Sequence, residues 1–139
     1  MFKRILVGVD GSEHGYKAAR VAGNLARHMQ ADLWIVASFE EVPRWLGDAA
    51  LQEAITERVR QANEILGHAR QVIGEIPGAL TTEVLEGPPA EAILTIADAH
   101  EVDLIVMGTR GLGRLAGLLL GSQSQKVAAH AKCPVLLVR

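Results

Sequence analysis

The sequence predicts an α/β fold in which a doubly wound parallel sheet is covered by helices on both faces. Short apolar runs alternate along all 139 residues with longer segments that carry apolar side chains every three or four positions. The runs at 4–9, 32–38, 102–108 and 133–139 are almost continuously apolar, which is typical of strands buried on both faces. No repeat or linker interrupts the alternation, so we expect one domain, residues 1–139.

A tight turn separates the first strand from the first helix. The strand at 4–9 stops at "DGS", where Ser12 can cap a helix whose apolar positions follow 3/4 spacing. A second strand at 32–38 leads into a loop at 39–50 and then into a long helix. One face of that helix carries the apolar residues Leu51, Ile55, Val59, Ala62, Ile65, Leu66, Ala69 and Ile73.

Three more strands and two more helices complete the alternation. "PG" at 77–78 precedes a third strand at 79–86, and "GPP" at 87–89 starts a helix because proline suits a first helical turn. The fourth strand is expected at 102–108 and the last helix near 122–131, before the closing strand "CPVLLVR". Helical crossovers between parallel strands are nearly always right-handed, which favours a doubly wound sheet.

Composition argues against several classes of function. The net charge of −2 gives no overall basic field to attract nucleic acid or an anionic membrane. No apolar run approaches the roughly 18 residues of a membrane span, and the first residues reach an aspartate too early for a signal peptide. The single cysteine, Cys133, excludes an intrachain disulfide. We therefore expect a cytoplasmic protein that binds neither nucleic acid nor membrane.

The stretch "GTRGLGRLAGLLLGSQS", from Gly108 to Ser124, has the components of an anion site. It lacks the P-loop pattern, and its glycines at 111, 113 and 117 do not have the G-x-G-x-x-G spacing of dinucleotide sites. Glycines at a strand end let backbone N–H groups approach a phosphate, and a Gly-Ser pair at a helix start adds free N–H groups and the helix dipole. The central leucines equally suit a structural plug, so the residues alone leave both interpretations open.

The spacing Gly108-x2-Gly111-x9-Gly121-Ser122 resembles the G-2x-G-9x-G-[S/T] signature of the ATP-binding branch of the universal stress protein family. The segments "ILVGVDGSE", "GPPAEAILTIADAHEVDLIVMGTRG" and "GSQSQKVAAHAKCPVLLVR" are also similar to that family, and together they cover essentially the whole chain. The resemblance implies a Rossmann-like five-stranded sheet of order 3-2-1-4-5 that holds an adenine nucleotide. In that order the winding reverses between strands 1 and 4, so the ligand crevice should lie between Asp10 and Gly108.

The resemblance also implies which residues contact the nucleotide. The Asp10 carboxylate would bind the ribose or help to place a metal ion, although aspartate at such a position also commonly caps the following turn. Met107 would pack on the base, although a buried strand methionine ordinarily belongs to the core. Ser38, whose backbone would read the adenine edge, and Gln123 stand where the family commonly has an apolar residue. The predicted nucleotide-binding set is Gly8, Val9, Asp10, Ser38, Met107, Gly108, Thr109, Arg110, Gly111, Arg114, Gly121, Ser122, Gln123 and Ser124.

The function that follows from the resemblance is an ATP-binding stress-response regulator or binding module with little or no turnover. ATP, ADP or AMP would be the ligand, and Mg²⁺ would arrive with the nucleotide, with Asp10 as its nearby carboxylate. No catalytic residue is predicted, because no general base stands out beside the phosphates. A nucleotide-free dimeric interaction protein of the same fold and a slow ATP hydrolase are the alternatives.

The position of the last strand in the sheet indicates how two copies of the chain could assemble. In the order 3-2-1-4-5 it lies at a sheet edge, and a bare apolar edge is an aggregation hazard. Universal stress proteins pair this strand with its copy in a second subunit, so the resemblance implies a homodimer through residues 134–139. Pro134 lacks an N–H donor, and pairing should therefore begin beyond it.

Overall fold

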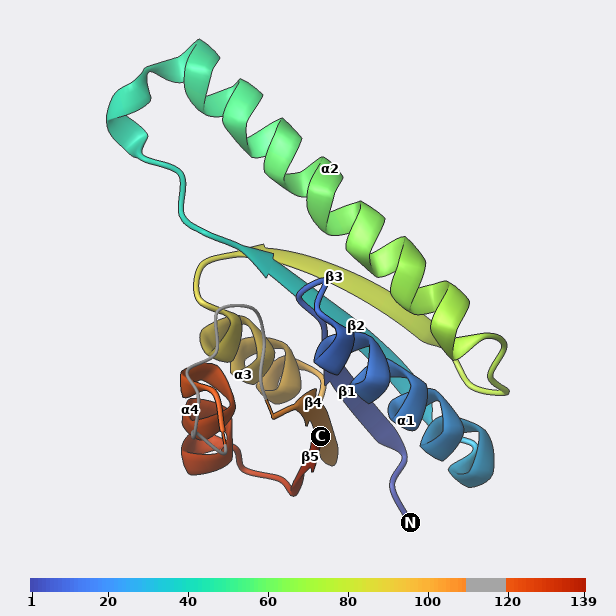
Figure 1. The fold of residues 1–139 in the computed structure, drawn as a ribbon. Helices are drawn as coiled ribbons and strands as arrows, with labels where there is room; N and C mark the ends of the chain where they lie inside the picture. The colour runs from blue at the N-terminus through green and yellow to red at the C-terminus, as the bar shows by residue number, and fades with distance from the viewer. Residues whose placement is uncertain (110–119) are drawn as a thin grey trace.

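The computed structural model describes residues 1–109 and 120–139 (Figure 1). Within them, five strands form one parallel sheet in the order β3-β2-β1-β4-β5. The strands are β1 (Arg4–Gly8), β2 (Asp32–Phe39), β3 (Leu80–Glu86), β4 (Leu104–Gly108) and β5 (Val135–Val138). The helices are α1 (Glu13–Met29), α2 (Asp48–Ile73), α3 (Pro89–Ala99) and α4 (Ser122–His130), with a 3-10 turn, η1 (Arg44–Leu46). The predicted fold class and strand order are confirmed.

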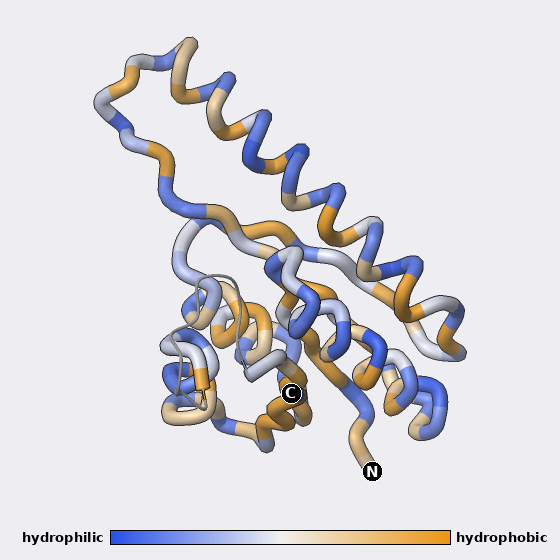
Figure 2. Tube along the Cα trace, in the orientation of Figure 1, coloured by the Kyte–Doolittle hydropathy of each residue, from blue (hydrophilic) through white to orange (hydrophobic). Residues whose placement is uncertain are grey.

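The sheet separates two apolar cores. Helices α1 and α2 cover one face and α3 and α4 cover the other (Figure 1). Along β1, Ile5 and Val7 point into the first core while Leu6 points into the second. Side chains on both faces of the central strands therefore leave water, which is why these runs are almost continuously apolar (Figure 2).

The predicted start of the fourth strand was two residues too early. Val102 and Asp103 precede β4, because the regular pairing with β1 begins at Ile5↔Leu104. The Asp103 N–H still donates to the Arg4 carbonyl at 2.9 Å, and the Asp103 carboxylate accepts hydrogen bonds from the N–H groups of Lys3 and Arg4. The long helix begins at Asp48 and so takes in the end of the predicted loop. The other predicted strands and the last helix agree with the structure to within one or two residues at each end.

Only half of the apolar stripe predicted on α2 is fully buried. Ala62, Leu66, Ala69 and Ile73 pack in the core, whereas Leu51, Ile55 and Val59 are half-buried. A helix of 26 residues is about 39 Å long, whereas a strand of 8 residues spans about 27 Å. The first half of α2 therefore extends past the sheet (Figure 1).

The two halves of α2 should differ in their contribution to stability. Leu66→Ala should lower the free energy of unfolding by about 2–5 kcal/mol, because it leaves a cavity in a closed core. The matched change Leu51→Ala should cost less than about 1.5 kcal/mol, because that side chain is already partly in water. Urea unfolding followed by circular dichroism measures both values, and equal losses would contradict this division of the helix.

Candidate functional site

The carboxyl ends of β1 and β4 lie side by side at the centre of the sheet. The pair runs in the register Ile5↔Leu104, Leu6↔Ile105 and Val7↔Val106. The chain leaves β1 toward α1 on one face, and α4, which follows β4 in the chain, covers the other face. The segments that follow the two strands thus diverge to opposite faces of the sheet, at the position where doubly wound sheets bind ligands. Asp10 and Thr109, just beyond the two strands, are brought to this edge.

Asp10 organises the turn at the end of β1. Its Oδ1 accepts hydrogen bonds from the backbone N–H (3.0 Å) and the hydroxyl of Ser12. The Ser12 Oγ in turn accepts from the Gly15 N–H at 3.1 Å and caps α1. The turn-capping interpretation of Asp10 and the predicted cap at Ser12 are therefore confirmed. The second carboxylate oxygen, Oδ2, is not bonded within the described part of the chain, and Asp10 is exposed.

The start of α4 is tied to the end of β4. The Gly121 N–H donates to the Thr109 carbonyl at 2.6 Å, and the Ser124 hydroxyl donates to the Gly108 carbonyl at 2.8 Å. The ladder of α4 begins with the Gln125 N–H bonded to the Gly121 carbonyl. The three N–H groups before it, at 122–124, precede that ladder, and no side chain of the described residues caps them. The positive end of α4 therefore lies beside the end of β4.

Two predicted side chains are engaged in structural contacts. Ser124 is 4% exposed and its hydroxyl proton is directed to a backbone carbonyl. The Gln123 Oε1 accepts a hydrogen bond from the Ala90 N–H at 2.9 Å. The backbone N–H groups, more than these side chains, are what this turn offers to a ligand.

The remaining predicted residues are distributed between the edge and the core. Gly8 lies against α3, and Val9 is 6% exposed. Ser38 is half-buried near the end of β2. Met107 is 7% exposed and packs in the core beneath α3 and α4, as the core interpretation predicts; its contact with a base stays a prediction. Arg110, Gly111 and Arg114 lie outside the described residues.

Sequence reasoning missed the contact between Gly108 and α1. A Cβ at Gly108 would lie 2.8 Å from the His14 carbonyl oxygen and 2.9 Å from the His14 Cβ. The His14 Nδ1 is buried and has no hydrogen-bond partner in the described part of the chain. Nothing in the sequence signals this contact, since it depends on how closely α1 packs on β4. Packing against α1 alone therefore favours glycine at position 108.

A tyrosine packs beside the same turn. The Tyr16 ring lies 4.3 Å from the His68 ring of α2, centroid to centroid. Burial raises the pKa of the Tyr16 hydroxyl, and the negative charge of Asp10 raises it further. The Tyr16 hydroxyl therefore stays protonated and neutral near the Asp10 carboxylate.

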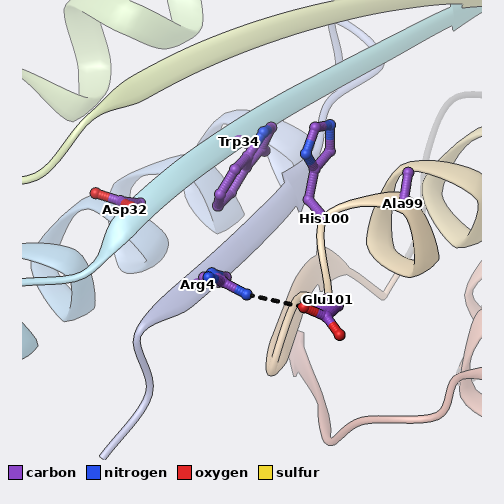
Figure 3. Close-up of a pocket in the computed structure, with 6 residues that line it drawn as sticks. All are labelled: Arg4, Asp32, Trp34, Ala99, His100 and Glu101. Atoms are coloured by element: carbon purple, nitrogen blue, oxygen red, sulfur yellow. Dashed lines mark hydrogen bonds and ion pairs between the residues drawn. The ribbon is translucent and has the colours of Figure 1, made fainter.

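An open pocket of about 400 Å³ lies at the opposite edge, where the strands begin (Figure 3). It is lined by Arg4, Asp32, Trp34, Ala99, His100 and Glu101. The Trp34 and His100 rings stack at 5.1 Å, and Arg4 pairs with Glu101 at 3.4 Å. The Asp32 Oδ1 accepts from the Ala79 N–H. These contacts join the strand starts to the end of α3, and we assign them to stability.

Two features are absent from the described residues. None of the helices there has both the length and the apolar character needed to cross a membrane. Across residues 1–109 and 120–139, no three histidine, cysteine, aspartate or glutamate side chains gather in a way that could hold a metal ion.

The sheet and the reversal of its winding between β1 and β4 define a doubly wound α/β protein. Residues 1–139 match the sequence model of the universal stress protein family. The chain is 48% identical over 139 residues to a universal stress protein of Thermus aquaticus, with all of both chains covered. It is 34% identical over 148 residues to the universal stress protein YxiE of Bacillus subtilis, again with all of both covered. The chain belongs to the universal stress protein family.

Solved structures agree with this assignment. UspA of Lactobacillus plantarum superposes with a TM-score of 0.86 at 29% identity, covering 99% of this chain and 98% of that one. A universal stress protein solved in complex with cAMP superposes with a TM-score of 0.68 at 29% identity, covering 99% of this chain and 97% of that one.

The packing requirement at Gly108 can be tested by comparing two glycine substitutions. Gly108→Ala should lower the free energy of unfolding by about 1–3 kcal/mol, because backbone atoms of α1 must move to admit the methyl group. Gly67→Ala is the control: a Cβ there meets nothing within 4 Å, and alanine in an exposed helix interior should stabilise by about 1 kcal/mol. Denaturant unfolding of both variants gives the comparison. A Gly108→Ala protein as stable as the wild type would show that the contact has room to relax.

Proposed function

We propose that this universal stress protein binds an adenine nucleotide at the crevice between β1 and β4. The observation that carries the proposal is the N-terminus of α4. Its three uncapped N–H groups are held at the end of β4 by the Gly121–Thr109 and Ser124–Gly108 hydrogen bonds. A helix start of this kind is a ready-made site for a phosphate group.

Related proteins support adenine as the base. A universal stress protein at 29% identity was solved in complex with cAMP. One from Archaeoglobus fulgidus, which shares 23% identity and the same fold, was solved with dAMP. ATP is our proposal for this chain, with ADP and AMP as alternative ligands of the same site.

Different groups at the carboxyl edge of the sheet would contact different parts of a nucleotide. The N–H groups at 122–124 and the exposed Ser122 hydroxyl would contact phosphate. The backbone at Ser38 would contact the adenine edge. The unbonded Asp10 Oδ2 would accept from a ribose hydroxyl or bind Mg²⁺. A single carboxylate fits Mg²⁺ that is carried mainly by phosphate oxygens and water.

We propose a regulator or binding module with little or no intrinsic turnover. Asp10 is the carboxylate at the crevice, and Ser12 already holds one of its oxygens in the turn. This arrangement suits a fixed acceptor better than a base that must take and release a proton. Steady phosphate release that disappears in Asp10→Asn while ATP binding survives would favour the slow hydrolase.

The proposal extends to a cytoplasmic homodimer formed through β5. The Pro134 carbonyl accepts from the Ile105 N–H of β4, and the Val138 carbonyl accepts from the Thr109 N–H just after β4. The backbone groups of Val135 and Leu137 therefore face the open edge. Leu136 is 39% exposed beside them. Pairing with a second β5 would satisfy these groups and cover the apolar side chains.

Nucleotide binding is tested most simply by titration calorimetry with Gly121→Val. Gly121 has φ −70° and ψ 160°, which valine adopts without strain, so the variant should fold. Its side chain should obstruct the approach of a phosphate to the helix start and weaken ATP binding by roughly tenfold or more, about 1.4 kcal/mol. Wild-type protein that binds neither ATP nor AMP would overturn the proposal. Unchanged affinity in folded Gly121→Val would overturn the assigned site.

The dimer is tested by sedimentation of Leu136→Lys. The wild type should sediment as a dimer at micromolar concentration. Lysines from both copies would lie close together near the centre of the β5–β5 pair, and their repulsion should shift the variant toward monomer. A monomeric wild type would contradict the interface, as would a Leu136→Lys protein that dimerises as strongly as the wild type.

A further inference from the structure

Helix α3 begins without a cap of its own. Its N-cap residue, Pro88, makes no side-chain hydrogen bond, and Pro89 in the first turn has no N–H. The Ala92 N–H already bonds the Pro88 carbonyl. The Ala90 N–H, the first donor of the helix, is instead satisfied by the Gln123 Oε1 at 2.9 Å, from a residue 33 positions later.

Gln123 belongs to the turn of α4 that would hold phosphate. Helices α3 and α4 pack beside each other on one face of the sheet, and both begin at its carboxyl edge (Figure 1). The N-termini of the two helices therefore lie within the length of one glutamine side chain. Each end carries the partial positive charge of its helix dipole.

The side chain that caps α3 is an uncharged amide, where a carboxylate would also be able to cap the helix. Carboxylates are common caps, and an anion near a helix N-terminus stabilises the helix. A carboxylate at position 123 would satisfy Ala90 at least as well as the amide does. It would also place a negative charge in a half-buried position beside the phosphate. The acidic residue in the first turn of α3, Glu91, is exposed and screened by water.

We infer that Gln123 is a positioning residue that sets the charge selectivity of the nucleotide site. It caps α3 with a neutral amide, so that the dipoles of α3 and α4 both remain available to an anionic ligand. This inference rests on the proposed nucleotide site. It assigns to the side chain of Gln123 a role separate from that of its backbone N–H.

The test is Gln123→Glu, which keeps the acceptor and changes the charge. Its melting temperature should equal or exceed that of the wild type, because the cap is retained. ATP affinity, measured by calorimetry at low salt, should fall by roughly tenfold. The affinity for adenosine, which carries no phosphate, should change by less than about twofold. The difference in ATP affinity between the variant and the wild type should shrink at high salt.

Two further variants separate charge from packing. Gln71→Glu makes the same change in net charge at an exposed position near the far end of α2, and ATP affinity should not change. Gln123→Leu removes the cap without adding charge, so it should melt below the wild type but lose less ATP affinity than Gln123→Glu.

The outcomes distinguish this inference from the proposed function. Wild-type protein that binds no nucleotide overturns both. Wild-type protein that binds ATP, together with Gln123→Glu that binds it equally well, overturns only the inference. An equal loss for ATP and adenosine, or a Gln123→Glu that melts as low as Gln123→Leu, also overturns it and leaves Gln123 as a packing residue.

Discussion

The parallel pairing of β1 with β4 is the constraint on which the rest of the structure depends. Once these strands lie side by side, the segments that follow them must reach helices on opposite faces, and their carboxyl ends diverge. The divergence brings Asp10 and Thr109 to one edge, although they are far apart in the sequence. It also seats the first turn of α1 so closely on Gly108 that backbone atoms of α1 must move to admit a Cβ. The position of the candidate site is therefore a consequence of the topology.

Several groups at this edge have a structural role that is compatible with the proposed binding of a ligand. Asp10 uses one oxygen to hold its own turn and leaves the other unbonded in the described structure. Ser124 uses its hydroxyl to fasten α4 to β4, and the N–H groups of that turn remain uncapped. At the described residues, the structural-plug and phosphate-cradle interpretations are therefore compatible, because the same hydrogen bonds would serve both. An edge held in this way would need little rearrangement to bind a ligand, which would lower the entropy cost of binding.

Much of the fold could be predicted from the sequence because the strands are buried on both faces and must be apolar throughout. The strand order came from the family resemblance, since the apolar pattern alone allows more than one doubly wound arrangement. The β4 start was misplaced because an apolar run does not show where pairing with β1 begins, and that pairing starts at Ile5↔Leu104. The uneven burial along α2 could not be predicted, because periodicity identifies a helix face but not the length of sheet available to cover it. The Gln123–Ala90 contact has no local signal in the sequence at all.

The central claim is that the N-terminus of α4 binds the phosphate of an adenine nucleotide. The most direct measurement is an ATP titration of ¹⁵N-labelled protein, with the backbone amide signals followed by nuclear magnetic resonance. The account predicts that the signals of Ser122, Gln123 and Ser124 shift the most and saturate together, while those at the strand starts, such as Asp32, stay in place. Amide signals at 122–124 that do not move while other regions respond to ATP, or no response at all at millimolar nucleotide, would contradict it.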